Sequence, residues 1–210
     1  MVLTLVQHAS ADLIPYPTPG IENPVTYSFT AASTGDVIAY FAGSAAAFDN
    51  VLGMEVNGVL SPNGFGLDNH TSAIGQSFNL GSVNAGDSIT FVMHNVQPGL
   101  GDLYSDPTRN GPYDNGASHN HIYSTVYTSL DPFHTFPGVP PGTYVAFEDL
   151  PGQDPTPFTR DWNYFDETFV FTNISTITGG ANVPLPSTAL CGVVLLAGLM
   201  GRRVFRRQYA

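Results

Sequence analysis

The residues best suited to chemistry lie between positions 148 and 167, where acidic side chains are densest. Six carboxylates fall there, with Arg160 as the only base: Glu148, Asp149, Asp154, Asp161, Asp166 and Glu167. Carboxylate and amide oxygens are the ligands of hard cations, and Ca²⁺ takes six to eight oxygen ligands. We therefore predict a calcium site on one loop and the strand end that faces it, with the ligands Glu148, Asp149, Asp161, Asn163 and Asp166.

This stretch is not an EF-hand. An EF-hand loop that began at Asp161 would need glycine at its sixth position and glutamate at its twelfth, where Asp166 and Thr172 stand. The alternative to metal binding is that the acids only form turns and solvate the loop, since Asp and Asn are common turn residues.

Two histidines offer a weaker metal pattern. His119 and His121 are two residues apart, so on a strand they would share one face and supply half of a zinc site. His94 and His134 are the remaining candidate ligands, but no spacing selects them. A polar strand face is the interpretation that we favour for this pair.

No pattern indicates catalysis. The chain has no Gly-x-Ser-x-Gly motif, its single cysteine, Cys191, lies in an apolar tail, and nothing selects a catalytic pair among 17 acids. We therefore predict a protein that is not an enzyme. The competing hypothesis is a secreted carbohydrate-binding module or polysaccharide-active enzyme, with aromatic side chains stacked on sugar. Its candidates are Trp162, Tyr104, Tyr113, Tyr123, Tyr127 and Tyr164.

Short strands separated by Gly, Pro, Asp and Asn turns must position these residues. This pattern predicts an all-β fold, an antiparallel β-sandwich or jelly roll, followed by one C-terminal hydrophobic helix. The predicted strands are Val25–Ala31, Asp36–Gly43, Val51–Asn57, Gly75–Leu80, Ser88–His94, His119–Thr128, Thr143–Phe147 and Thr168–Asn173.

The chain divides into four predicted segments. Residues 1–11 resemble the second half of a signal peptide, because Ala9-Ser10-Ala11 matches the small-residue cleavage pattern. A short native strand is the alternative for this end. Residues 12–175 form the sandwich domain, 176–187 a linker with a sorting motif, and 188–210 a transmembrane helix with an arginine-rich end.

Charge separates the body from the tail. Residues 12–182 hold all 17 acids and two arginines, a net charge of about −15, whereas four of the six arginines lie in the last nine positions. A body with two basic residues cannot neutralise several phosphates, so nucleic-acid binding is excluded. Bound cations would relieve the self-repulsion of such a body.

The C-terminus has the order of a membrane anchor. The apolar run from Pro184 to Gly201 would make a helix of about 27 Å, close to the ~30 Å hydrocarbon core of a bilayer. A basic stop of Arg202, Arg203, Arg206 and Arg207 follows, and the positive-inside rule keeps it in the cytoplasm. The acidic body is then expected on the opposite side of the membrane.

This tail resembles the PEP-CTERM protein-sorting signal. That signal consists of a proline-containing motif, an apolar helix and a terminal arginine cluster. The motif here is Val183, Pro184, Leu185 and Pro186, with leucine where the commonest form has glutamate. The resemblance implies export, transient anchoring in the inner membrane and processing by an exosortase-type sorting peptidase. It implies a final location at the cell surface or in the extracellular matrix of a Gram-negative bacterium.

A second resemblance covers Gly142–Asn173. The strand end Phe147-Glu148-Asp149-Leu150, followed by the loop from Asp161 to Asp166, is similar to a domain of unknown function in exported PEP-CTERM proteins. It implies an extracellular β-rich module without an assigned reaction. Together these observations predict a non-enzymatic, exported surface or biofilm-matrix protein that binds calcium and contacts extracellular polysaccharide.

Overall fold

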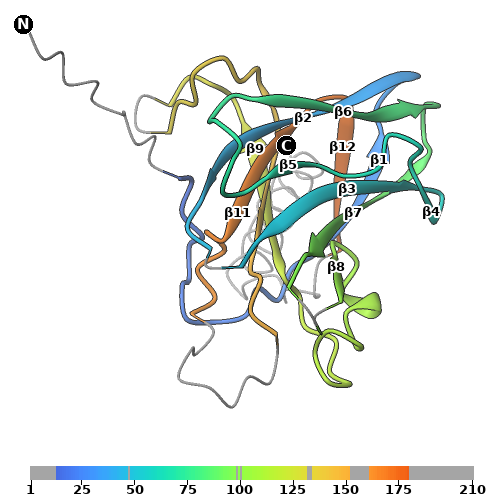
Figure 1. The fold of residues 1–210 in the computed structure, drawn as a ribbon. Helices are drawn as coiled ribbons and strands as arrows, with labels where there is room; N and C mark the ends of the chain where they lie inside the picture. Colours follow the sequence, from blue (N-terminus) through green and yellow to red (C-terminus); the bar gives the residue numbers. More distant parts are fainter. Residues whose placement is uncertain are drawn as a thin grey trace, which may run out of the picture. The chain divides into compact units, whose positions relative to one another are not determined.

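The computed structural model describes residues 13–179, apart from 47, 98, 100, 132–133 and 152–160. Its described part is all-β and consists of two antiparallel sheets (Figure 1). One short 3₁₀ helix, η1 (Pro107–Arg109), is the helical element of this part. The prediction of an all-β, sandwich-like body is confirmed.

Each sheet combines strands that are distant in the sequence. The first sheet has the order β12 (Ile174–Gly179), β1 (Thr26–Ala31), β7 (Ser88–Asn95), β3 (Asn50–Val56) and β4 (Val59–Leu60). In addition, β5 (Gly66–Asp68) pairs with β3, and β8 (Asp102–Tyr104) pairs with β7. The second sheet has the order β6 (Ser77–Val83), β2 (Gly35–Ser44), β11 (Glu167–Phe171), β10 (Gly142–Phe147) and β9 (Ile122–Tyr127).

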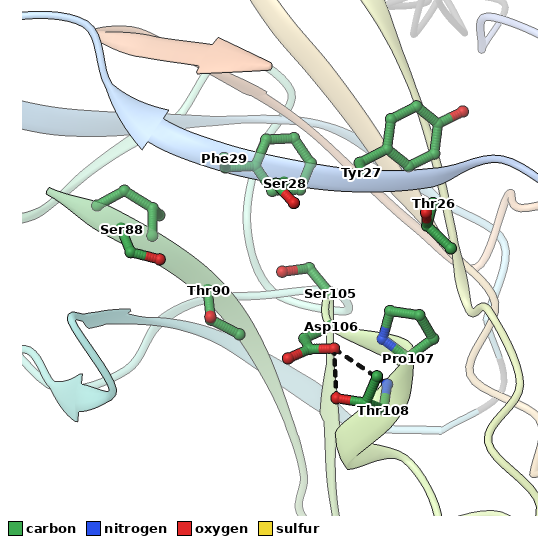
Figure 2. A pocket seen from close by; sticks show the side chains of 11 residues that line it. Thr26, Tyr27, Ser28, Phe29, Ser88, Thr90, Ser105, Asp106, Pro107 and Thr108 are labelled. Carbon is green, nitrogen blue, oxygen red and sulfur yellow. Dashed lines mark hydrogen bonds between the residues drawn. The ribbon is translucent and has the colours of Figure 1, made fainter. Parts of the chain in front are cut away.

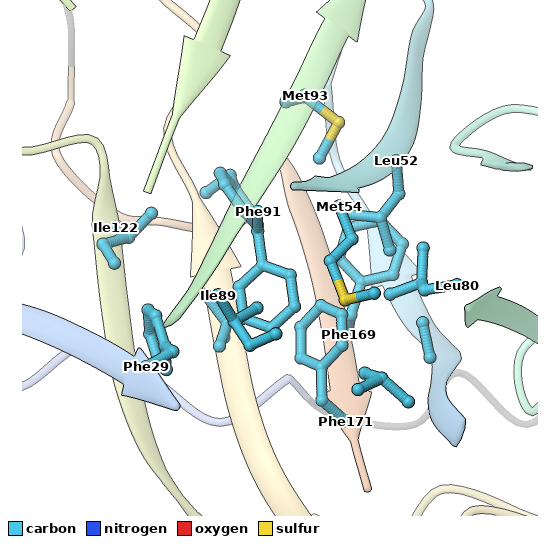
Figure 3. Packing of buried hydrophobic residues seen from close by; sticks show 14 of the residues in the cluster. Phe29, Leu52, Met54, Leu80, Ile89, Phe91, Met93, Ile122, Phe169 and Phe171 are labelled. Carbon is cyan, nitrogen blue, oxygen red and sulfur yellow. The ribbon is translucent and has the colours of Figure 1, made fainter. Parts of the chain in front are cut away.

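The main core lies between the two sheets. Phe91 of β7 and Phe171 of β11 stack with ring centroids 3.8 Å apart, which joins the centres of the two sheets (Figure 3). Phe29, Met54 and Phe169 pack in the same cluster. These residues alternate with outward-facing ones along their strands, because successive side chains of a strand point to opposite faces.

A second core covers the outer face of the second sheet. Tyr144 and Val170 point into it, together with Tyr16 from the N-terminal segment and Trp162 and Tyr164 from the loop before β11. As a result, β11 is buried at all five positions. A strand buried on both faces is apolar without alternation, and a charged residue at its end is also withdrawn from water.

The structure extends the sequence-based description in two places. Strands β4, β5, β8 and β12 were not predicted; three of them have only two or three residues. The fourth, β12, pairs with all of β1 and continues to Gly179, into the segment assigned as linker. Five of its six residues are exposed, so the core imposes no apolar pattern on them.

The predicted signal peptide, sorting motif, C-terminal helix and arginine cluster lie outside the described residues. Among the described residues, no helix has the length and apolar character needed to cross a bilayer.

Candidate functional site

The β10–β11 hairpin brings three of the five predicted ligands together. Phe147 at the end of β10 pairs with Glu167 at the start of β11, so the residues just beyond them meet. The backbone N–H of Asp149 donates to Oδ2 of Asp166 at 2.7 Å. Glu148 lies between these paired positions. The structure therefore brings Glu148, Asp149 and Asp166 together beside the loop of this hairpin.

Two residues that we did not predict complete this cluster. Asn50 begins β3 in the opposite sheet, and its Nδ2 donates to Oδ2 of Asp149 at 2.8 Å and to Oε1 of Glu167. One amide group thus links two carboxylates of the other sheet. We call Glu148, Asp149, Asp166 and Glu167 the acidic group.

The acidic group is withdrawn from water. Glu148 and Glu167 are fully buried and Asp149 is 2% exposed, whereas Asp166 is partly buried. Four side-chain oxygens here are buried without a hydrogen-bond partner: both carboxylate oxygens of Glu148, Oε2 of Glu167 and Oδ1 of Asn50. An unpartnered buried polar atom is costly, and an unpaired buried charge is more costly still. In the described part of the chain, none of the ion pairs involves the acidic group.

Burial favours the protonated forms of Glu148 and Asp166. Burial, together with the nearby charges of Asp166 and Asp161, raises the pKa of Glu148 to about 9. Burial also raises the pKa of Asp166 to about 8, helped by the charge of Asp149. Without a cation, these carboxyl groups hold protons near neutral pH.

The two carboxyl groups held by Asn50 behave alike. Burial raises the pKa of Asp149 to about 6, although the hydrogen bond from Asn50 acts in the opposite direction. Burial raises the pKa of Glu167 well above its ordinary value, and the charges of Asp149 and Asp166 add to this effect. The four groups share protons as one system, because each one's charge opposes ionisation of its neighbours.

The other two predicted ligands are used in turns. Asp161 is exposed; its Oδ1 accepts from the backbone N–H of Asn163 at 3.1 Å, and its Oδ2 accepts from the Asn163 amide at 2.5 Å. Oδ1 of Asn163 accepts from the backbone N–H of Phe165 at 2.7 Å. The structure therefore does not bring Asp161 and Asn163 into the buried cluster, and turn formation accounts for both.

Two aromatic residues anchor this loop. Trp162 and Tyr164 adopt positive φ angles of 46° and 58°, which non-glycine residues rarely do. Both are buried, and the Tyr164 hydroxyl accepts from the backbone N–H of Asn23 at 2.8 Å and donates to the carbonyl of Asn120 at 3.0 Å. Burial and these long-range hydrogen bonds offset the local strain.

The donor chemistry of the cluster fits a hard cation. All four unpartnered atoms are oxygens, and carboxylates and amides are the side chains that bind Ca²⁺. Across the described residues, however, no three His, Cys, Asp or Glu side chains are arranged to hold a metal ion.

The histidines do not form the zinc half-site. Both ring nitrogens of buried His121 are engaged: Nε2 lies 2.9 Å from Oδ1 of Asp114 and Nδ1 lies 2.7 Å from the carbonyl of Glu148. Nδ1 of His119 lies 2.8 Å from Oε2 of Glu22. The two other candidates also face carboxylates, in the pairs His94–Asp102 and His134–Asp131. A metal could therefore reach His121 only by breaking one of its two hydrogen bonds, and no group of three metal-binding side chains forms around these histidines among the described residues.

The aromatic residues proposed for sugar stacking are largely withdrawn from the surface. Trp162, Tyr113, Tyr127 and Tyr164 are buried, and Tyr123 is half-buried. The ring of Tyr104 lies under the guanidinium of Arg109, 3.6 Å from the ring centroid. These side chains build the cores, as most aromatics of a sandwich do.

Comparison with protein-family models, curated proteins and solved structures finds no match for this chain. The fold and the site define a two-sheet, all-β protein with a buried acidic group at the end of the β10–β11 hairpin.

Proposed function

We propose that this chain is an exported, non-enzymatic β-sandwich protein of the cell surface or exopolysaccharide matrix, stabilised by calcium at the acidic group. The observation that carries the proposal is the set of buried oxygens without partners on Glu148, Glu167 and Asn50. Four carboxyl groups without a basic partner can be accommodated by holding protons or by binding a cation. A divalent ion would replace the protons and supply the missing contacts.

The role of the ion in this proposal is structural. Asp149 and Glu167 face Asn50 across the two sheets, so a cation bound there would connect them at the end where β3, β10 and β11 meet. A ligand that binds only the folded state stabilises it by mass action. An exported protein meets calcium after it leaves the cytoplasm, and its folded state would then become more stable outside the cell.

Terbium luminescence tests this site directly, because Tb³⁺ occupies calcium sites and is excited through nearby indole rings. Trp162 is the single tryptophan of the chain and belongs to the loop that leads to Asp166. We expect Tb³⁺ emission upon tryptophan excitation, displacement by Ca²⁺, and loss of the signal in Glu148→Gln. The matched variant Glu22→Gln, whose carboxylate contacts His119, should keep it.

Emission that is absent from the unmodified protein, or that is equal in Glu148→Gln and Glu22→Gln, would contradict the calcium proposal. The two variants make the same chemical change, so a difference between them reports the position of the carboxylate.

The exported location rests on the PEP-CTERM resemblance and on the charge asymmetry between body and tail. We expect that deletion of Val183–Ala210 releases the body in soluble form, whereas the full chain is retained in the membrane fraction before processing. Fractionation followed by immunoblotting measures this. A deleted form that stays with the membrane would show that the anchor lies elsewhere.

A further inference from the structure

The first sheet is split next to β1. Strands β1 and β7 pair only at Phe29–Ile89 and Thr30–Ser88. Farther along, β7 pairs with β8 instead, from Val92–Tyr104 to His94–Asp102. Ser105 closes the split, because its backbone N–H donates to the carbonyl of Phe91 and its Oγ accepts from the Phe91 N–H, both at 2.9 Å.

A cavity of about 270 Å³ occupies this split (Figure 2). We call it the hydroxyl groove, because six of its lining residues are serine or threonine. They are Thr26, Ser28, Ser88, Thr90, Ser105 and Thr108. Figure 2 shows Ser28, Thr90 and Ser105 facing one another across the gap, with Asp106 below them.

Asp106 is the one charged residue that lines the hydroxyl groove. Its Oδ1 accepts from the backbone N–H of Thr108 at 3.0 Å and from the Thr108 hydroxyl at 2.8 Å, which fixes the carboxylate in place. The hydroxyls of Thr26, Ser105 and Thr108 already take part in hydrogen bonds within the protein. The groove therefore presents the hydroxyls of Ser28, Ser88 and Thr90 and a positioned anion. The aromatic rings of Tyr27 and Phe29 are buried in the core and offer no stacking surface.

We propose that the hydroxyl groove binds one neutral sugar unit of a polysaccharide. A hydroxyl both donates and accepts, so a set of them matches a sugar ring whose hydroxyls do the same. A carboxylate accepts from sugar hydroxyls but repels phosphate, sulfate and uronate groups. The lining holds no base that would favour an anion.

The size of the groove limits the ligand. Pockets for drug-sized ligands run from about 300 Å³ upward, so this cavity suits a single ring. Without aromatic stacking, binding depends on hydrogen bonds that replace those to water, and we expect a dissociation constant on the order of 1 mM. Such weak contacts become useful when many copies face a repetitive polymer.

Saturation-transfer NMR on the full chain tests the proposal. The probes are the methyl glycosides of glucose, galactose and mannose, with methyl glucuronide as the charged comparison. We expect transfer to at least one neutral glycoside and none to the glucuronide. Ser28→Tyr, which places a ring in the groove from the exposed side of β1, should abolish transfer.

Thr90→Val has nearly the shape of threonine but loses the hydroxyl, and should weaken binding about tenfold, the effect of one hydrogen bond. The control Thr176→Val makes the same change on β12, outside the groove, and should leave binding unchanged. Asp106→Asn can still accept from Thr108 and preserves the turn, and it should admit the glucuronide.

Absence of transfer to all three neutral glycosides, or equal binding by Thr90→Val and Thr176→Val, would overturn the proposal. The experiment is run with calcium and again with a chelator. The hydroxyl groove shares no residue with the acidic group, so failure here would leave the calcium proposal standing, and the reverse also holds.

Discussion

Calcium is expected to raise the melting temperature of the metal-free protein by roughly 5–10 °C at pH 8. A ligand present at about a hundred times its dissociation constant adds about 2.7 kcal/mol to the free energy of unfolding. For chains of 150–250 residues, each kcal/mol shifts the melting temperature by roughly 2–4 °C. The ion would take the place of protons that the fold otherwise keeps on these carboxyl groups, and it would give Glu148 its missing contacts.

Thermal unfolding followed by circular dichroism, with a chelator or with millimolar Ca²⁺, measures this shift. Glu148→Gln should lose the calcium-dependent gain, and Glu22→Gln should retain it. Mg²⁺ should act more weakly, because it demands octahedral geometry and dehydrates reluctantly. A melting temperature that millimolar Ca²⁺ leaves unchanged in the unmodified protein would count against a structural calcium ion.

The metal-free protein is expected to lose stability as the pH rises from 5 to 8. Burial raises the folded-state pKa of Asp149 to about 6, of Asp166 to about 8 and of Glu148 to about 9, all above the values of the unfolded chain. At any pH between a group's unfolded-state pKa and its folded-state pKa, the folded state binds more protons than the unfolded state. Its stability is therefore full below the unfolded pKa and declines as the pH approaches the folded pKa.

The free energy of unfolding is expected to fall by about 4 kcal/mol for each proton that the folded state holds across these three pH units, since one unit corresponds to 1.36 kcal/mol. Urea unfolding at intervals from pH 5 to pH 8, with a chelator present, measures it. Calcium should remove most of the decline, because it takes the place of the protons. A stability that is constant or rises over this interval without metal would be inconsistent with a buried, protonated acidic group.

The titration of one histidine also lowers stability as the pH rises, and its contribution must be separated from that of the acidic group. The hydrogen bond to the carbonyl of Ala46 raises the pKa of His70, so its contribution to stability also declines as the pH rises. Glu148→Gln leaves this contribution intact and removes one titrating carboxyl group. The difference in slope between the variant and the unmodified protein therefore separates the contribution of the acidic group from that of His70.

Local patterns in the sequence were sufficient to place most of the fold. The predicted strands Val51–Asn57 and Ser88–His94 differ from β3 and β7 by one residue at each changed end, because their inward-facing residues must be apolar. Strand β12 escaped prediction because the core does not constrain its exposed residues. Strands of two or three residues, such as β4 and β5, are too short to show a period.

Part of the acidic group was predictable for a similar reason. Glu148, Asp149 and Asp166 flank the loop of one hairpin, and the pairing of the two strands brings these positions together. Asp161 and Asn163 were chosen for their chemistry, but short-range turns use their oxygens. Sequence spacing alone cannot distinguish an oxygen free to bind a cation from one that accepts a backbone N–H.

The sequence by itself determined an all-β body, the hairpin that carries the acidic residues, and the separation of an acidic body from a basic tail. The tertiary structure decided that these acids are buried, because the second core covers β11 on its outer face. It also decided that Asn50, 99 residues before Asp149, joins the acids, since only sheet packing brings distant positions together. The hydroxyl groove exists for the same reason: β1 and β8 share one edge of β7 and leave space between them.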